Sequence, residues 1–372
     1  MKFENQTIEE KSINAIRLLS ADAIQKANSG HPGLPMGCAP LAFWLYSNAM
    51  KHNPKNPNWK NRDRFVLSGG HGSMLLYSAL HLSGYDISMD DIKDFRQWGS
   101  VTPGHPEFGL TPGVETTTGP LGQGFANAIG MAAAEKFLAA KFNKENFELL
   151  NHKIYTLMGD GDMMEGLSHE AASFAGRNKL DNLIAFYDNN TITIEGRTSL
   201  AFTEDVAKRF ESYDWFVQHV SDINDLKQLD SAIENAKAAE GKPSLIIVDS
   251  VIGYGSPNKK DTAGIHGSPL GEEELRLTKE NLGWDPDKSF FVPDEVYEYF
   301  KEKTAEGAEA EEEWNKLFAD YKNKFPKEAK LFEKIFAGNF GGEWKGNLPE
   351  FNEFGSKLAT RSASGKVINA MK

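Results

Sequence analysis

Two short polar motifs in the sequence could bind one metal ion together. Gly159-Asp160-Gly161 directly follows a predicted strand, and Asn189-Asn190 directly follows the next predicted strand. One predicted helix separates the two strands, and in a right-handed βαβ unit both strand ends open on the same edge of the sheet. We therefore expect Asp160 and Asn190 to converge at that edge.

The oxygen atoms of these motifs suit a hard divalent cation. A carboxylate, an amide oxygen, a main-chain carbonyl from the loop after Asn190 and two diphosphate oxygens would together bind Mg²⁺ or Ca²⁺. Gly161 would allow the backbone to approach a phosphate closely beside a helix N-terminus. Gly159-Asp160-Gly161 by itself is equally typical of a tight turn in which Asp160 caps the helix. The asparagine pair at the matching position favours the cation and diphosphate.

Four of the nine histidines lie in loops rich in glycine and proline: His31, His71, His105 and His266. An imidazole can donate a hydrogen bond to a hydroxyl or move a proton near neutral pH. Each histidine alone is compatible with an ordinary loop residue, but four in the same half of one domain favour a binding or catalytic site.

The segment Gly119-Pro120-Leu121-Gly122-Gln123-Gly124 precedes a predicted helix. Its backbone amides could contact a heterocycle or a phosphate. It is not a dinucleotide-binding fingerprint, because the GxGxxG pattern with a following acidic residue is missing.

The elements that position these motifs alternate between strands and helices. A capping box at Thr7 and Glu10 predicts a helix that ends at Gly30, followed by a loop over 29–37 and a helix over 41–50. Strands are predicted at 64–68, 153–158, 182–188 and 244–252, and further helices at 73–84, 125–142, 165–180 and 226–239. This order predicts an α/β fold with a parallel sheet covered by helices on both faces. The long irregular stretch 99–124 is typical of a binding loop.

Composition limits the classes of partner. The chain has 372 residues, 40% of them hydrophobic, and a formal net charge of -12, which argues against nucleic acid or an anionic membrane as the main partner. Cys38 is the only cysteine, so an intrachain disulfide and a thiolate metal cluster are excluded. The sequence has no run of eighteen apolar residues and no signal-peptide pattern, and we expect a cytoplasmic location.

Taken together, the motifs resemble the diphosphate-binding half of transketolases. The resemblance rests on SGHPGLPMG, FVLSGGHGSMLLY, TPGHPE, TTGPLGQG, GDGDMMEG, FYDNN, IGYGSPNK and IHGSPLGEEE, which occur in family order from about residue 8 to the C-terminus. It implies the thiamine diphosphate-binding fold, thiamine diphosphate with Mg²⁺ or Ca²⁺ as cofactors, and a homodimer. The implied reaction moves a two-carbon ketol unit from a ketose phosphate to an aldose phosphate in the pentose phosphate pathway.

The resemblance assigns roles to individual residues. The metal ligands would be Asp160, Asn190 and the main-chain oxygen of Ile192. The cofactor would contact, besides Asp160 and Asn190, the residues His71, His266, Gly119, Pro120, Leu121 and Gly161. Proton transfer and sugar binding would fall to His31, His105 and His266, sugar-phosphate binding to Arg361, and a subunit interface to Glu165.

Domain organisation follows from the same resemblance. We predict a diphosphate domain over 1–285, a helical appendage and linker over 286–350, and the start of a pyrimidine-binding domain over 351–372. The rest of that domain, with the glutamate that activates the aminopyrimidine, is missing from the sequence. We therefore expect a truncated chain that needs a second subunit or the missing C-terminal portion, and no turnover by this chain alone.

Three other functions remain open from the sequence. One is a thiamine diphosphate synthase, similar to deoxyxylulose-phosphate synthase, that decarboxylates pyruvate and condenses it with an aldehyde. A second is a transketolase variant that uses formaldehyde as acceptor. The third is a noncatalytic dimerisation or regulatory module.

Overall fold

The computed structural model describes residues 3–339, 342–352 and 357–371. The chain divides into two units, Met1–Leu317 and Phe318–Lys372. The predicted domain boundaries at 285 and 350 remain predictions, and residues 340–341, 353–356 and 372 of the predicted C-terminal segments lie outside the described residues.

A five-stranded parallel sheet forms the centre of the first unit, with the strand order β1-β2-β3-β7-β6. The strands are β1 (Arg64–Leu67), β2 (Ile154–Met158), β3 (Leu183–Asn189), β6 (Phe216–Val220) and β7 (Ser244–Asp249). A short antiparallel pair, β4 (Ile192–Thr193) and β5 (Gly196–Arg197), follows β3. The predicted α/β class with a parallel sheet is confirmed.

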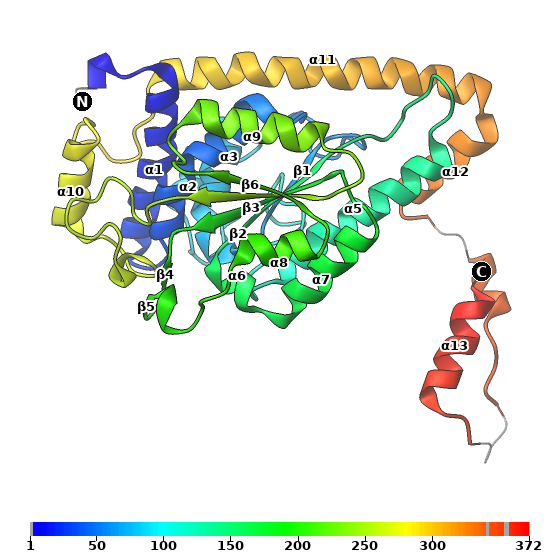
Figure 1. The fold of residues 1–372 in the computed structure, drawn as a ribbon. Coiled ribbons are helices and arrows are strands. Elements are labelled where there is room, and N and C mark those ends of the chain that lie inside the picture. The colour runs from blue at the N-terminus through cyan, green and yellow to red at the C-terminus, as the bar shows by residue number, and fades with distance from the viewer. Residues whose placement is uncertain (1–2, 340–341, 353–356, 372) are drawn as a thin grey trace. The chain divides into compact units, whose positions relative to one another are not determined.

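Helices cover both faces of this sheet (Figure 1). Alternate strand residues point to opposite sides, so Leu157 and Phe186 belong to one core while Met158 and Tyr187 belong to the other. The first core lies under α1 (Ile8–Ala27), α2 (Gly33–Trp44), α3 (Ser73–Leu82) and α9 (Leu226–Ala238). The second lies under α5 (Gln123–Phe142), α6 (Asp160–Met164), α7 (Gly166–Arg177) and α8 (Val206–Ser212).

The remaining helices complete both units. They are α4 (Met89–Lys93), α10 (Glu272–Asn281), α11 (Asp294–Lys324), α12 (Pro326–Phe336) and α13 (Thr360–Ala370). Short helical turns are η1 (Phe3–Asn5), η2 (Leu45–Ala49), η3 (Gly70–Gly72), η4 (Thr198–Leu200), η5 (Ala263–Ile265) and η6 (Glu343–Asn347). Within the described ranges, no helix is both long enough and apolar enough to span a membrane.

Local signals predicted most of the principal elements correctly, but some bounds differ and several elements, among them α4, α8 and α10, were not predicted. The Thr7 and Glu10 capping box forms, but α1 ends at Ala27, because the C-cap residue Asn28, with a φ of 48°, closes the helix before Gly30. Helix α2 begins at Gly33, inside the predicted loop, because Pro32 precedes a run of residues that are buried against the core. Strand β6 was not predicted, since an edge strand that is only partly buried lacks a continuous apolar run.

Candidate functional site

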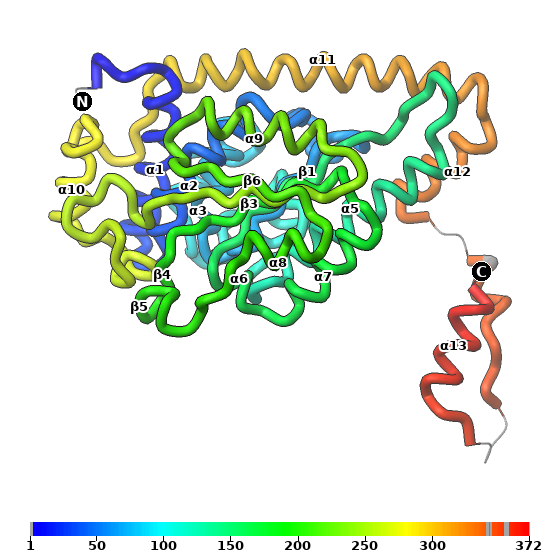
Figure 2. Tube along the Cα trace, in the orientation of Figure 1, coloured from blue at the N-terminus to red at the C-terminus, as the bar shows by residue number. Residues whose placement is uncertain are grey.

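The two predicted metal-binding motifs meet at the carboxyl edge of the sheet. Strands β2 and β3 pair in parallel, with Met158 opposite Tyr187. Their chains therefore leave the sheet side by side, and α6 lies next to β4 (Figure 2). The Tyr187 hydroxyl donates to Oδ1 of Asp160 at 2.5 Å, and the backbone N–H of Thr191 donates to the same carboxylate. Asp160 is thus held from the strand and loop that carry Asn190.

The second oxygen of Asp160 has no hydrogen-bond partner. Asp160 is 4% exposed, and its buried Oδ2 is unpaired. The pKa of Asp160 is raised to about 7, mainly by burial; the Tyr187 hydroxyl opposes this rise, and the nearby negative charge of Asp188 adds to it. A buried carboxylate oxygen without a donor is costly, and a bound cation would remove that cost. The Asp160 oxygen therefore fits a metal ligand.

Asn190 is fixed through both ends of its amide. Its Nδ2 donates to Oδ2 of Asp188 at 2.7 Å, and its Oδ1 accepts from the backbone N–H of Ile192 at 2.9 Å. These two contacts assign which amide atom is the oxygen. Asp188 is itself buried and also accepts from the Ser250 hydroxyl and the Cys38 thiol. The amide oxygen of Asn190 is therefore positioned independently of any ligand.

The two glycine motifs touch each other. A Cβ placed on Gly161 would lie 2.8 Å from Cδ1 of Leu121, so the loop before α5 packs on the turn that carries Asp160. Gly70 lies against the same loop, because a Cβ there would be 2.6 Å from Oγ1 of Thr118 and 2.8 Å from the backbone nitrogen of Gly119. The loop before α5 is therefore in close contact with both Gly70 and Gly161.

The four predicted histidines come together beside these loops. The ring centroids of His31 and His71 are 5.1 Å apart, those of His31 and His266 are 5.7 Å apart, and those of His71 and His266 are 5.1 Å apart. His105 lies next to Gly119, where an added Cβ would be 3.3 Å from its Cδ2. Gly69 connects this group to the other loops, since a Cβ there would be 3.4 Å from Cε1 of His71.

These histidines are neutral at physiological pH. Burial, reinforced by the neighbouring histidines, lowers the pKa of His31 to about 4 and that of His71 to about 3. Burial also lowers the pKa of His105 and His266. The Nδ1 atoms of His31 and His266 are buried without a hydrogen-bond partner. Neutral imidazoles with an unused ring nitrogen can each exchange a hydrogen bond with a ligand.

Comparison with known proteins assigns a family to this arrangement. Residues 8–341 match the family model described as transketolase, thiamine diphosphate binding domain. The chain is 55% identical to a transketolase of Geobacillus stearothermophilus over 366 residues, which is 98% of this chain and 55% of the relative. It is 56% identical to a transketolase of Nostoc over 373 residues, covering 100% of this chain and 56% of the relative.

The chain belongs to the transketolase family.

Solved structures agree with this assignment. A transketolase of Pichia stipitis and one of Leishmania mexicana each superpose with a TM-score of 0.93 at 44% identity, over 98% of this chain and 54% of theirs. The chain spans about half the length of the curated transketolases it matches.

The remaining predicted residues are Glu165 in the first unit and Arg361 in the second. Glu165 is exposed at the junction of α6 and α7. Arg361 is exposed on α13 in the second unit. Their roles are supported by the resemblance alone.

Sequence reasoning missed four side chains at this site: Arg96, Asp162, Tyr187 and Asp188. Asp162 could have been found, since a carboxylate three residues after Gly159 is placed to cap the start of a helix. Arg96 has a φ of 61° and donates to the Ser29 hydroxyl at 2.7 Å, and its charge lowers the pKa of His31 and His105. Nothing local in the sequence marks Arg96, Tyr187 or Asp188, because their partners come from distant segments.

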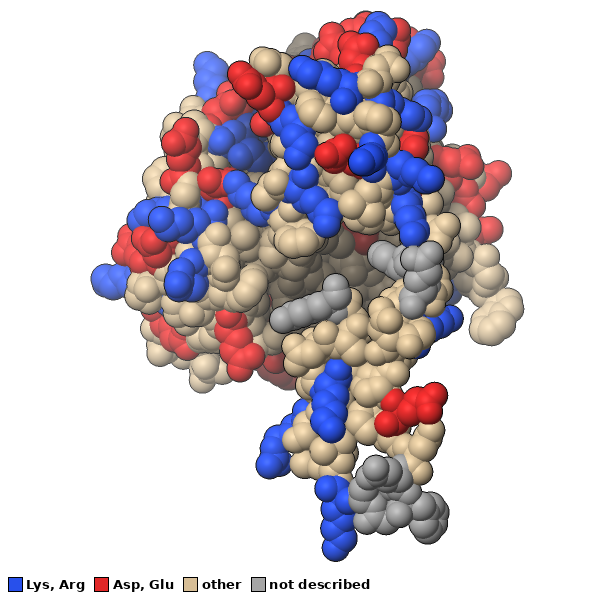
Figure 3. All heavy atoms as spheres, turned by 90° about the vertical axis from the view of Figure 1, so that its right-hand side faces the viewer, with Lys and Arg blue, Asp and Glu red and all other residues tan. Residues whose placement is uncertain are grey.

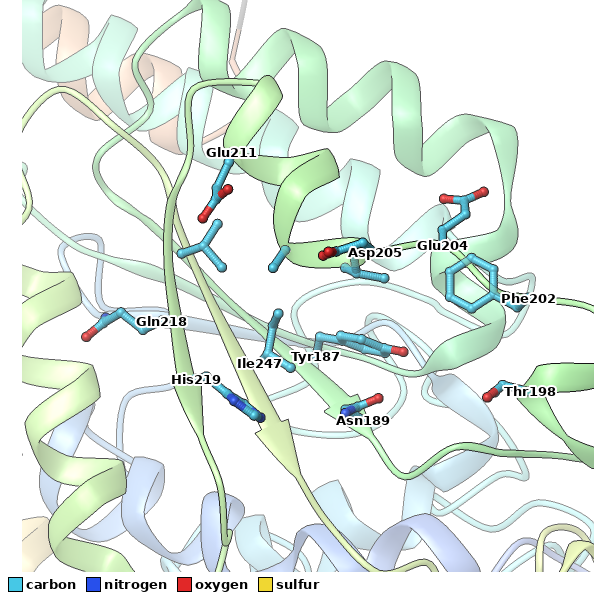
Figure 4. Close-up of a pocket in the computed structure, with 13 residues that line it drawn as sticks. Tyr187, Asn189, Thr198, Phe202, Glu204, Asp205, Glu211, Gln218, His219 and Ile247 are labelled. Carbon is cyan, nitrogen blue, oxygen red and sulfur yellow. The ribbon is translucent and has the colours of Figure 1, made fainter.

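A cavity of about 490 Å³ is lined by side chains from β3, β6 and β7 and from the segment that leads into α8 (Figure 4). Tyr187 and Asn189 line it, and Asn189 donates to Asp249 at 2.7 Å, which also pairs with His219 at 2.9 Å. Asn189 and Asn190 are therefore held by different aspartates, Asp249 and Asp188.

The charge at the site also favours a cation. Asp160, Asp162 and Asp188 are all buried at the same sheet edge. A diphosphate would be repelled there unless a cation neutralised part of this charge. In the part of the chain that the structure describes, no three His, Cys, Asp or Glu side chains form a metal-binding group. Any cation would therefore need amide and carbonyl oxygens as well.

Proposed function

We propose that this chain supplies the diphosphate-binding half of a transketolase. The reaction is transfer of a two-carbon ketol unit from a ketose phosphate to an aldose phosphate. The observation that supports it is the meeting of Asp160, Asn190 and four neutral histidines at one sheet edge, within a chain of this family. The Pichia stipitis enzyme has been crystallised with sedoheptulose 7-phosphate and, as a mutant, with fructose 6-phosphate.

The metal ligands we propose are Oδ2 of Asp160, Oδ1 of Asn190 and the main-chain oxygen of Ile192. The free oxygen of Asp160 and the fixed amide of Asn190 support this set. Mg²⁺ and Ca²⁺ both accept such ligands, with diphosphate oxygens and water to complete the shell. Thiamine diphosphate, when bound, supplies the electron sink for the chemistry.

The protein side chains would bind and orient the reactants. His71, Gly161 and the backbone from Gly119 to Leu121 are packed closely enough to enclose a diphosphate. His31, His105 and His266 would donate to sugar hydroxyls and move protons. A nearby phosphate would raise the low pKa of these imidazoles and so make them better proton acceptors. Arg361 would bind the sugar phosphate through its planar fork of donors.

We also propose a homodimer in the cytoplasm. Glu165 is exposed and packs against Gly122, the neighbour of Leu121. The apolar side chains of Leu121 and of Phe174 in α7 are 37% and 50% exposed, which suits a subunit interface. On the face in Figure 3, basic and acidic side chains are interspersed, and the overall charge of -12 does not suit nucleic acid or an anionic membrane as partner. Since the match covers about half of each relative, we propose turnover only together with the other half.

A coupled assay tests this function. The 372-residue chain is assayed with xylulose 5-phosphate and ribose 5-phosphate, alone and mixed with the C-terminal half of a transketolase relative. We expect ketol transfer only in the mixture, dependent on thiamine diphosphate and a divalent cation. Transfer from pyruvate instead would indicate the synthase reaction, and preference for formaldehyde would indicate the acceptor variant. Cofactor binding without any transfer would indicate a noncatalytic module.

A further inference from the structure

Asp162 connects three segments at the cofactor edge through one buried carboxylate. The side chain is 0% exposed. Its Oδ1 accepts from the Ser68 hydroxyl at 2.7 Å and from the backbone N–H of Gly122 at 2.7 Å, and its Oδ2 accepts from the backbone N–H of Gly159 at 2.9 Å. The donors come from the end of β1, the loop before α5 and the end of β2. All three segments border the proposed cofactor site.

The contacts around Asp162 continue into both adjoining helices. Ser68, which donates to Asp162, also accepts from the backbone N–H of Phe125 in the first turn of α5 at 3.0 Å. The Ser168 hydroxyl in α7 donates to the main-chain oxygen of Asp162 at 2.6 Å. Through these contacts, Asp162 connects the start of α5 with the start of α7.

The loop residue Gly122 cannot be replaced without moving this junction. Its φ is 77°, and an added Cβ would lie 2.9 Å from Oγ of Ser168 and 3.1 Å from Cβ of Glu165. The same loop carries Leu121, which packs on Gly161. The hydrogen bond from Gly122 to Asp162 thus fixes how far Leu121 reaches over the Asp160 turn.

Asp162 has no role as an ion-pair partner, since it belongs to none of the ion pairs found among the described residues. Burying a carboxylate is expensive unless every oxygen accepts hydrogen bonds. Here all three donors come from segments that surround the site, and two of them are backbone amides that lie in tight glycine turns. The carboxylate is therefore suited to hold these turns in place.

We propose that Asp162 is a positioning residue, which holds the Gly119–Gly122 loop against the Asp160–Gly161 turn before the cofactor binds. This inference rests on the proposed function, since it takes this edge as the thiamine diphosphate site. Without Asp162, the loop amides must be ordered when the cofactor binds, and the affinity falls by the cost of that ordering.

The test uses Asp162→Asn and a matched control, Asp63→Asn. Asp63 is 7% exposed and accepts from the backbone N–H groups of Lys51 and Lys153 at 2.8 Å each, at the opposite edge of the sheet. Each substitution turns one acceptor into a donor that faces a backbone N–H. Both variants should lose comparable stability, but only Asp162→Asn changes the cofactor loop.

Each chain is mixed with the C-terminal half of a relative, and the thiamine diphosphate concentration for half-maximal activity is measured at saturating Mg²⁺. We expect a rise of about tenfold or more for Asp162→Asn, with kcat at saturating cofactor unchanged, and less than a twofold rise for Asp63→Asn. An equal rise in both variants, or none in Asp162→Asn, overturns the proposal.

Hydrogen exchange of the Gly122 and Gly159 amides is measured on each chain without cofactor. We expect faster exchange of both amides in Asp162→Asn and unchanged exchange in Asp63→Asn. This arm separates the two hypotheses: a wild-type mixture that binds no thiamine diphosphate refutes the proposed function, whereas unchanged exchange in Asp162→Asn refutes the positioning role. If Asp162→Asn does not fold, Ser68→Ala removes one donor and should change the same measurements in the same direction by a smaller amount.

Discussion

At the amino edge of the sheet, Asp63 accepts a backbone N–H on each oxygen, and Glu115 binds Arg62 and Arg64 through both oxygens at 2.7 to 2.9 Å. At the carboxyl edge, Asp160 leaves one buried oxygen unpaired, and His31 and His266 each leave Nδ1 unpaired. The contrast is between two buried carboxylates: Asp63 accepts a hydrogen bond on each oxygen, whereas Asp160 leaves one oxygen without a donor. An unpaired buried group costs stability. The free atoms of Asp160, His31 and His266 therefore lower the stability of the chain but remain available to bind a ligand.

Some neutral groups at the amino edge are also buried without a partner, among them Oδ1 of Asn182, Oγ of Ser244 and the ring nitrogen Nδ1 of His152. Burial, together with the positive charge of Arg64, lowers the pKa of His152 to about 2, so the ring stays neutral. A neutral ring nitrogen is far cheaper to bury than the carboxylate oxygen of Asp160. The contrast between the edges therefore depends mainly on the carboxylates.

The largest expected effect comes from replacing Asp160 and Asp63, one at a time, by alanine. Asp160→Ala should lower thiamine diphosphate affinity in the complemented enzyme by a factor on the order of 100 or more, because it removes a metal ligand. It should leave the free energy of unfolding of the chain without cofactor unchanged or higher, because an unpaired carboxylate is lost. Asp63→Ala should leave the thiamine diphosphate affinity unchanged. It should lower the free energy of unfolding by about 2 kcal/mol, because two backbone amides lose their acceptor. Calorimetric cofactor titration and urea denaturation measure both; unchanged affinity in Asp160→Ala would refute the metal assignment.

The next effect tests whether Asn190 is oriented by Asp188. Asp188→Asn presents a donor to the Asn190 amide and removes a negative charge beside the cation. We expect metal affinity in the presence of thiamine diphosphate to fall about 10-fold. Titration with Mn²⁺, followed by electron paramagnetic resonance, measures this. Ser250→Ala, which removes a different donor to Asp188, is the control and should change the affinity less.

A pH effect should follow from the histidine cluster. In the folded chain the pKa values of His31 and His71, about 4 and about 3, lie below the ordinary histidine value of 6.5, so the unfolded chain binds protons first as the pH falls. Their contribution to stability is full above about pH 6.5 and is lost as the pH falls towards 4. Urea denaturation between pH 7 and pH 4 should show this loss, and His71→Asn should reduce its slope. An unchanged slope would contradict the low pKa of His71.

The smallest effect compares two glycines in the left-handed region. Gly122→Ala and Gly241→Ala each impose backbone strain of about 1 kcal/mol, since their φ values are 77° and 70°. Gly241 lies before β7 at the amino edge, and nothing lies within 4 Å of an added Cβ there. Gly122→Ala should therefore destabilise the chain more and raise the cofactor concentration for half-maximal activity a few-fold. Equal effects of both substitutions on cofactor affinity would argue against the Gly122 loop as part of the site.

The sequence predicted the main residues of the candidate site better than it predicted the edge of the sheet. Asp160 and Asn190 could be placed together because each follows a buried apolar strand, and consecutive parallel strands open on one edge. Edge strand β6 was missed because its polar residues Gln218 and His219 interrupt the apolar pattern. The capping position after Gly159 could have marked Asp162, but its bonds to Ser68 and Gly122 could not be predicted, because those residues belong to distant segments that no local pattern connects.

The sequence alone determined the element order, the parallel sheet and the motifs of the transketolase family, because periodicity, capping and turn residues act over a few neighbouring positions. Tertiary structure decided which loops meet. The order β1-β2-β3-β7-β6 brings the ends of β1, β2 and β3 together, and the packing of the loops around them brings His31 and His266 within 5.7 Å. Such contacts depend on crossovers between distant segments, and burial then fixes the pKa values that the same side chains would not have in an open chain.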